Sequence, residues 1–430
     1  MKEITMWPTW LQEQGMTEDD APMPVWLPAL RKKHRQAWQE SKLPSNQDER
    51  WKYTDLAFLQ TERHLRVAPA VSKNSCDAEL AQSLAGEVIS LVWLNGSFMP
   101  ELSNLAKLPD KIIASSIQDA LHLHPELIEA HFKKLQYTNA FVNLNAAMFT
   151  DGVFIFIPDN VVLNTPIHLL SMAKAGNAFV SHPHQIIQIG KNSQVTILEE
   201  HSGALAENYL KNMVTTIEVA AQAKLNYYKL QQESASAAHI ANTFIFQNQD
   251  SDVALTNFSY GAQFARDEVT AYLQEPGAQC RAAGFYQLKT VNQYIDNHIT
   301  FDHLAPRTQS EMLYKGVLAV KSRAVFNGRL HVAPEAKKIL AYQANHNLLL
   351  ANSAEVYSKP ELEIYADDVK CKHGATIGQL DQEALFYLRS RGIENREATE
   401  MLLAGFADDI LQRVIHPAIK THIQSKVGGQ

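Results

Sequence analysis

The spacing of apolar residues divides the chain into three regions. From about Pro24 to His131, apolar residues recur three and four positions apart, which is the period of an amphipathic helix. Within this region, the apolar run Val88–Leu94 is followed by the turn-forming pair Asn95-Gly96, and this pattern predicts one strand. We therefore expect a mostly helical N-terminal domain over residues 1–139, with a loop or linker at Ala68–Asp77, where large apolar residues are few.

The region from residue 140 to residue 370 consists of short apolar and β-branched runs, with no strong amphipathic helix between them. This pattern predicts a mainly β core built from many short strands. The predicted strands are Gly152–Ile157, Ile167–Leu170, Gln185–Ile189, Gln194–Leu198, Val214–Val219, Leu225–Leu230, Thr243–Phe246, Val253–Phe258, Ala282–Tyr286, Tyr294–Phe301, Met312–Val320 and Leu362–Val369.

Similar turns recur through this region, and each leads small or polar residues into an apolar one. The apolar markers are Val195, Leu225, Val253, Cys280, Val325 and Val356. They follow one another at steps of 30, 28, 27, 45 and 31 residues. A recurring step near 30 residues is typical of a solenoid, and the step of 45 is about one and a half coils. A β-sandwich or a barrel is the alternative, although sandwiches show no such spacing of similar turns.

A helical pattern returns at Leu380, so we place the β core at 140–379 and a C-terminal helical domain at 380–430. Asp381 is suited to be an N-cap, and Gly392 is placed to end the first helix. A second helix is expected to start near Asn395. Pro417 should kink or end that helix.

Composition is that of an ordinary globular protein, with 46% hydrophobic and 20% charged residues. The net charge of −7 gives no reason to expect a nucleic-acid or membrane partner. No apolar run approaches the roughly 20 residues that span a bilayer, and the first ten residues do not resemble a signal peptide. We expect a cytoplasmic protein whose three cysteines, Cys76, Cys280 and Cys371, are reduced.

Cys371 and His373 are the first candidates for chemistry, and they close an extended segment that runs from Glu361 to Lys372. Residues two apart on a strand share a face, so a thiol and an imidazole would lie side by side. Both are ligands for iron, copper or zinc, but two ligands are too few for a stable site. Either another strand or chain supplies more, or the pair is a buried thiol and a hydrogen-bonded core histidine.

Other candidates carry less weight. Asp367 and Asp368 are adjacent, as in β-helical polysaccharide hydrolases, but successive strand residues face opposite ways. Three histidine pairs lack a cysteine or carboxylate at motif spacing, and they are better read as core or surface residues: His122 with His124, His182 with His184, and His298 with His303. No standard nucleotide-binding motif occurs.

The stretch from Asn347 to Gly392 resembles the SufB/SufD family of iron–sulfur cluster assembly scaffolds. Two features are similar to the SufD branch in particular. The turn Cys371-Lys-His-Gly-Ala375 has glycine where SufB-type chains usually carry glutamate, and the segment Asp48-Glu-Arg-Trp-Lys-Tyr-Thr54 is similar to an N-terminal element of SufD. The resemblance covers most of the chain and is strongest in its last hundred residues.

This resemblance implies a right-handed parallel β-helix between helical ends. It also implies a non-enzymatic scaffold that pairs with a SufB-like chain and docks a SufC-like ABC ATPase on its C-terminal helical region. Nascent clusters would be built at the heterodimer interface, where His373 and the neighbouring Cys371 match the family motif. We assign the docking of the ATPase to four residues of the C-terminal region: Phe386, Tyr387, Arg389 and Arg391.

On this interpretation the chain holds no cofactor or metal by itself, and a nascent cluster would be shared with the SufB-like partner. The isolated subunit could also form a homodimer, because an exposed β-helix edge needs covering. Two alternatives stay open. The chain could be a purely structural partner that never contacts iron, or a free-standing carbohydrate-active enzyme, which would need no partner.

Overall fold

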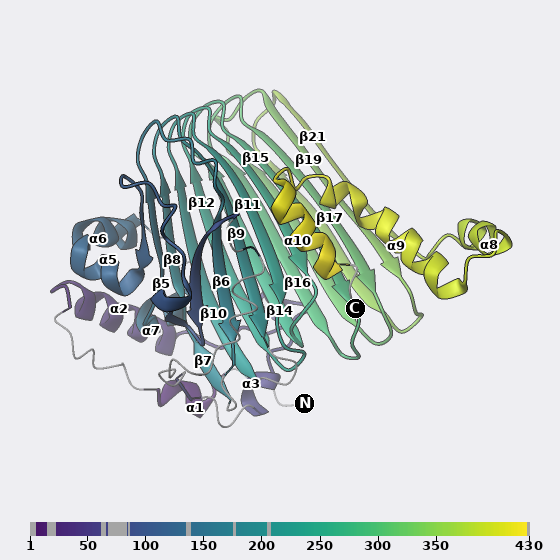
Figure 1. Ribbon diagram of the computed structural model, residues 1–430, viewed down its shortest axis with the longest axis horizontal. Helices are drawn as coiled ribbons and strands as arrows, with labels where there is room; N and C mark the ends of the chain where they lie inside the picture. The colour runs from purple at the N-terminus through teal and green to yellow at the C-terminus, as the bar shows by residue number, and fades with distance from the viewer. Residues whose placement is uncertain are drawn as a thin grey trace.

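Two long β-sheets form the body of the computed structural model, and from β8 onward successive strands alternate between them (Figure 1). The structure describes residues 6–14, 23–61, 66–67, 84, 87–134, 139–174, 178–203 and 208–427. The predicted linker Ala68–Asp77 and the thiol of Cys76 lie outside these residues. All neighbouring strands from β5 onward pair in parallel, which makes the body a two-sheet parallel solenoid.

We call the two sheets A and B. Sheet A contains β1 (Arg66–Val67), β4 (Ile113–Ser116), β5 (Gly152–Ile157), β7 (Phe179–Ser181), β8 (His184–Ile189), β10 (Tyr209–Val219), β12 (Ala238–Gln247), β14 (Phe264–Leu273), β16 (Tyr294–His303), β18 (Arg323–Val332) and β20 (Glu355–Ile364). Sheet B contains β2 (Ile89–Leu94), β3 (Ser97–Phe98), β6 (Ile167–Ala173), β9 (Gln194–Gly203), β11 (Lys224–Gln232), β13 (Asp252–Ser259), β15 (Gln279–Leu288), β17 (Gln309–Leu318), β19 (Ile339–Leu349) and β21 (Val369–Gly378).

The register confirms the solenoid and excludes the sandwich and the barrel. Four of the six turn markers are consecutive register partners in sheet B: Val195, Leu225, Val253 and Cys280. The step of 45 residues leads from β15 of sheet B to Val325 in β18 of sheet A, which is one and a half coils further on. The coils between these partners differ by up to three residues in length, and the turns absorb the difference, so like positions stay stacked and apolar residues that face the interior meet others from the next coil.

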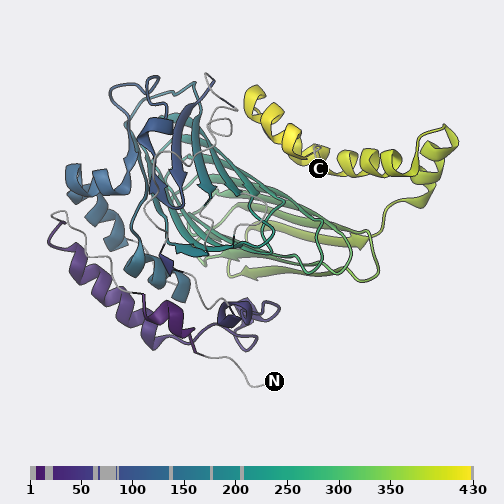
Figure 2. The ribbon, with the colours of Figure 1, turned by 60° about the horizontal axis from the view of Figure 1, so that its bottom comes forward.

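The core lies between the sheets, because alternate residues of every strand point inward. This interior cluster extends from Ile155 near the N-terminal end to Ile339 near the last coil, and both side chains are fully buried. Two further clusters cover the outer faces. One packs the N-terminal helices on sheet A, and the other packs the C-terminal helices on sheet B. Figure 2 shows these two groups of helices on opposite sides of the solenoid.

The extended segment predicted from Glu361 to Lys372 is wrong as a single strand. β20 ends at Ile364, the chain bends at Asp367 and Asp368, and β21 begins at Val369 in the other sheet. The strand predicted at Leu362–Val369 is wrong for the same reason. The apolar alternation of Leu362, Ile364 and Ala366 runs up to the bend, and the bend contains neither glycine nor proline, so only its two aspartates mark the turn. The long strands β14, β18 and β19 were not predicted, and neither were the short strands β1, β3, β4 and β7.

The N-terminal region adds strands to both sheets. The predicted strand is confirmed as β2, which pairs with β6, and the turn after it has the left-handed backbone of a tight hairpin at Asn95 (φ 52°) and Gly96 (φ 89°). β4 pairs with β5. The helical elements of the N-terminal region are α1 (Thr9–Gln12), α2 (Leu27–Glu40), η1 (Glu49–Trp51), α3 (Phe58–Thr61), η3 (Pro100–Leu102), α5 (Ile117–Leu123), α6 (Pro125–Lys134) and α7 (Ala140–Met148).

The C-terminal region consists of α8 (Gln382–Ser390), α9 (Asn395–Leu411) and α10 (Pro417–Val427). Asp381 Oδ1 accepts hydrogen bonds from the N–H groups of Glu383 and Ala384, which confirms the predicted N-cap. Gly392 follows α8 with φ of 88°. The prediction for Pro417 is wrong, because α9 already ends at Leu411. Pro417 instead opens α10, where its missing N–H group costs no hydrogen bond.

A buried arginine of sheet A is one of several side chains that hold the segment Asp48–Thr54. The guanidinium of Arg266 lies 3.8 Å from the centre of the Trp51 ring, and its Nη2 donates to the backbone oxygen of Arg50 at 3.0 Å. Arg266 also pairs with the buried carboxylates of Asp296 and Glu268. The segment Asp48–Thr54 is thus packed against a buried ion network of sheet A and is not a free surface loop.

We expect Arg266→Met to lower the free energy of unfolding by about 3–5 kcal/mol, because it removes the buried cation that Asp296 and Glu268 share. The matched control is Arg323→Met, which removes an exposed pair with Glu355 and should cost less than about 1 kcal/mol. Urea denaturation measures both. Equal losses in the two variants would contradict the anchoring role of Arg266.

Candidate functional site

The last coil of the solenoid is open on its outer side. β20 pairs only with β18, and β21 pairs only with β19, so among the described residues neither strand has a second neighbour. Each strand therefore presents a row of backbone N–H and C=O groups without sheet partners, which is a template for pairing with another chain. This end lies opposite the N-terminal helices, beside the C-terminal arm (Figure 1).

Cys371 and His373 lie on β21 at this open end. Their register partners on β19, Ala341 and Gln343, are buried in the interior. Cys371 packs against the interior core, and since His373 is two residues on, it faces the same way. No further coil covers β21, and the His373 side chain is exposed. The predicted sharing of one face is therefore confirmed by the register, although the strand that carries it is shorter than predicted.

The two described thiols differ in accessibility. Cys371 is half-buried, and burial raises the pKa of its thiol above the ordinary value of 9.0. Cys280 is fully buried between the sheets, and burial raises its pKa further. Both are free of disulfide bonds. At neutral pH both are thiols rather than thiolates, so in the isolated chain Cys371 is a weak nucleophile and a weak metal ligand.

Two polar groups just inside the open end were not predicted. Gln343 is fully buried beside His373 in the register, and its Oε1 has no hydrogen-bond partner among the described residues. Ser358 lies on β20, in register with the interior residue Phe326, and its Oγ also lacks a partner there. A polar residue at an inward position of a strand is the signal that could have identified them, but β19 and the first half of β20 were not predicted as strands.

Apolar side chains surround the open end. Tyr365 is 63% exposed and Ile377 is 52% exposed, although both belong to the last coil or its bend. The other large exposed apolar residues of this rim are Leu340, Tyr342, Leu350, Tyr357 and Ile364. Such a patch around an unpaired sheet edge marks a surface for a protein partner.

One buried group has the composition of a metal site. His201, Glu233 and His239 place their ligand atoms within 4.8 Å of one another inside the solenoid. Lys211 Nζ, however, lies 2.8 Å from Glu233 Oε1 and 3.1 Å from His201 Nδ1. The ammonium group supplies the positive charge that a metal would bring, and burial together with this ammonium lowers the pKa of His201 to about 4. The geometry is that of a closed ion network.

The remaining candidates have structural surroundings. His184 is buried beside α7 and bonds to Asn145 Oδ1 at 2.7 Å. His303 is buried between the hydroxyl groups of Thr308 and Ser310. The acidic pair at 367 and 368 is exposed in the bend before β21, and neither carboxylate has a described ion pair.

The helix α8 is the other exposed feature of this end. Phe386 is 72% exposed, and none of the residues of α8 is buried. Tyr387 and Arg389 are exposed as well, and Arg391 lies over the Tyr387 ring at 5.3 Å. Figure 1 shows α8 projecting from the body at the end of the arm formed by α9 and α10. Of the four residues assigned to docking from the sequence, three thus lie on a protruding helix, and Arg391 directly follows it.

Comparison with known proteins supplies the family. Residues 171–406 match the family model described as "SUF system FeS cluster assembly, SufBD core domain", and residues 12–169 match "SufBD protein N-terminal region". The chain is 33% identical to an iron–sulfur cluster assembly SufBD family protein of Synechocystis over 87% of this chain and 84% of that one.

Two further relatives cover nearly the whole chain. The iron–sulfur cluster assembly protein SufD of Escherichia coli is 29% identical, over 92% of this chain and 91% of its own length. The chloroplastic protein ABCI7 of Arabidopsis thaliana is 28% identical, over 90% of this chain and 82% of its own. In the part of the chain that the structure describes, no helix is both long and apolar enough to cross a membrane.

We expect iodoacetamide to alkylate Cys371 in the folded chain and to leave Cys280 unmodified, because only the first thiol reaches solvent. The rate at Cys371 should rise with pH up to a midpoint above 9, since burial raises its pKa. Peptide mapping by mass spectrometry separates the sites, and alkylation in urea is the control in which Cys280 must react. A midpoint below 9, or modification of Cys280 in the folded chain, would contradict this account.

Proposed function

Because the chain belongs to the SufBD family of iron–sulfur cluster assembly proteins, we propose that it is a SufD-type scaffold subunit whose open solenoid end pairs with a SufB-like chain. The observation that carries the proposal is the unpaired edge of β20 and β21, which presents Cys371 and His373 at its mouth. A homologous solenoid has the same two-sheet spacing, so its own end strands could extend both sheets at once.

In this role the chain contributes part of a shared site. The imidazole of His373 and the thiol of Cys371 are two ligands for iron, and the partner supplies the others. The nascent cluster is cargo of the assembled pair rather than a resident cofactor of this chain. Pairing would also bury the apolar rim, and the lower water content would strengthen every charge interaction at the mouth.

The ATPase of the system is proposed to dock on α8. An exposed phenylalanine and tyrosine next to two arginines have the composition of a binding hot spot. Since α8 is joined to β21 by the short link 379–381 and packs against α9, movement of a docked ATPase would act on the scaffold both at the last coil and through this arm. A shift between two arrangements requires the ATPase to bind one of them better than the other. The proposed complex is cytoplasmic, and the chain itself has no enzymatic role in it.

A purely structural role is the second candidate, and the exposed apolar rim favours it. In that case Cys371 and His373 only pack the interface and never contact iron. The two candidates predict different consequences for the same substitution, because a packing residue affects assembly of the complex while a ligand affects its product.

We expect His373→Ala to leave assembly with the SufB-like chain intact and to lower the yield of clusters by about tenfold or more, as loss of a group near a metal typically does. Size-exclusion chromatography reports assembly, and the absorbance of the reconstituted complex reports cluster formation. The control is Lys372→Ala, which changes an exposed neighbour on the other face of β21. Unchanged cluster yield would refute the ligand role, and loss of the complex would favour the structural one.

We expect the double substitution Phe386→Ala and Tyr387→Ala to weaken ATPase binding by about 10- to 100-fold, since aromatic anchors dominate such interfaces. Stability should stay within about 0.5 kcal/mol, because both side chains are exposed. Isothermal titration with the purified ATPase measures the affinity. Val162→Ala changes an exposed residue far from α8 and serves as the control; equal affinity of all three proteins would exclude α8 as the docking site.

A further inference from the structure

Gln343 is a glutamine in the interior of the solenoid, one coil inside the open end. It is fully buried on β19, and its register partner on β21 is His373. Register partners on neighbouring strands lie about 4.8 Å apart and point to the same face, so the two side chains are neighbours. One coil further in, the same position is taken by Met312 on β17, which is apolar and buried. The interior therefore becomes polar at this position only in the last two coils.

The Gln343 side chain crosses the interior from sheet B to sheet A. Its Nε2 donates to the backbone oxygen of Glu361 on β20 at 3.4 Å. Gly328 on β18 leaves room for the amide group, because a Cβ atom at position 328 would lie 2.6 Å from Gln343 Oε1. Glycine in the middle of a strand weakens the strand, and this close approach explains its presence here. The amide group thus lies across the interior directly inside the last coil.

Gln343 differs from the other buried amides of β19 in its hydrogen bonding. Asn347 Nδ2 donates to Asn345 Oδ1 at 2.7 Å, and Asn345 Nδ2 donates to the hydroxyl of Tyr286 at 3.2 Å. Gln343 Oε1, by contrast, has no hydrogen-bond partner within the described part of the chain. A buried acceptor without a donor destabilises the fold, so packing alone does not account for this glutamine. The unfilled acceptor lies on the neighbour of His373.

We propose that Gln343 is a positioning residue for His373, and that its Oε1 accepts a ring N–H of His373 once a partner covers the open end. This inference rests on the proposed function. Covering the open end removes water from the exposed His373 ring, so its N–H then needs an acceptor inside the solenoid. The hydrogen bond fixes the tautomer of the ring, and the other ring nitrogen keeps its lone pair for iron.

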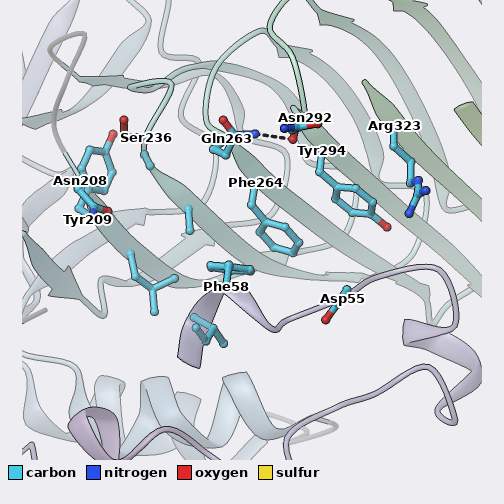
Figure 3. A pocket seen from close by; sticks show the side chains of 14 residues that line it. Asp55, Phe58, Asn208, Tyr209, Ser236, Gln263, Phe264, Asn292, Tyr294 and Arg323 are labelled. Carbon is cyan, nitrogen blue, oxygen red and sulfur yellow. Dashed lines mark hydrogen bonds between the residues drawn. The ribbon is translucent and has the colours of Figure 1, made fainter. Parts of the chain in front are cut away.

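Gln343→Leu removes the acceptor and keeps a buried side chain of similar size. In the complex with the SufB-like chain, we expect it to leave assembly intact and to lower the cluster yield by about tenfold. Because Gln343 acts through His373, adding His373→Ala should lower the yield no further than His373→Ala alone. Gln263→Leu is the matched control just before β14, three coils from β20, where Gln263 Nε2 donates to the backbone oxygen of Asn292 (Figure 3). It makes the same chemical change and should leave the yield unaltered.

Gln343→Glu keeps an acceptor at the same place and tests the hydrogen bond itself. We expect its cluster yield to exceed that of Gln343→Leu by at least about threefold. The pH midpoint of cluster formation should also move upward, because a carboxylate beside the imidazole of His373 raises the pKa of the ring, and a protonated ring binds no iron. A residue that only packs the interior would show neither effect.

The outcomes distinguish this inference from the function on which it rests. If His373→Ala leaves the cluster yield unchanged, the proposed function fails, and the positioning role fails with it. If His373→Ala lowers the yield and Gln343→Leu does not, only the positioning role fails. Additive losses in the double variant also overturn it, because the two residues then act independently. If thermal unfolding shows that Gln343→Leu does not fold, Gln343→Met, with an unbranched side chain, is held to the same criteria.

Discussion

Parallel pairing between successive coils is the constraint on which the rest of the molecule depends. Every coil hydrogen-bonds its backbone N–H and C=O groups to the coils before and after it, so the pairing itself sets no limit on the number of coils that can stack. At the N-terminal end, β4 pairs antiparallel with β5 and helices cover the outer face of sheet A. At the other end no such cap exists among the described residues. The unpaired edge thus coincides with Cys371 and His373, the two residues that we propose as iron ligands.

The interior of the solenoid contains charged residues as well as apolar ones. A solenoid of this width could be filled by aliphatic side chains alone, yet between β9 and β12 it encloses Glu199, His201, Lys211, Glu233 and His239. Burial by itself would raise the pKa of Glu199, but the neighbouring His201 outweighs it and lowers the pKa to about 2. The ammonium group of Lys229 and the hydroxyl group of Tyr227 act in the same direction as His201. The charges are mutually compensated. Such networks contribute little net stability, but they tolerate only one register, because a slip by one residue would bury unpaired charges.

The sequence permits prediction of the fold further than of the site. The coil repeat could be recognised in the sequence because similar turn residues precede Val195, Leu225 and Val253. In the structure these three residues are register partners on successive strands of sheet B. The turn between β20 and β21 was missed because its residues, with Asp367 and Asp368 among them, carry no glycine or proline. Cys371 and His373 could be placed on one face from their spacing. Their position at an unpaired edge could not, because it depends on where the stack of coils ends.

The C-terminal arm crosses the outer face of sheet B rather than resting on one coil. His422 of α10 bonds to Glu200 on β9 at 2.9 Å, while Arg413, just after α9, reaches Glu311 on β17. Between these points, the N–H of Ile415 donates to the hydroxyl of Tyr228 on β11. The arm therefore straps together the five strands from β9 to β17. A load applied at α8 reaches β21 directly through the link 379–381, and it also passes through α9 and α10 into several coils, so the last coil does not carry the load alone.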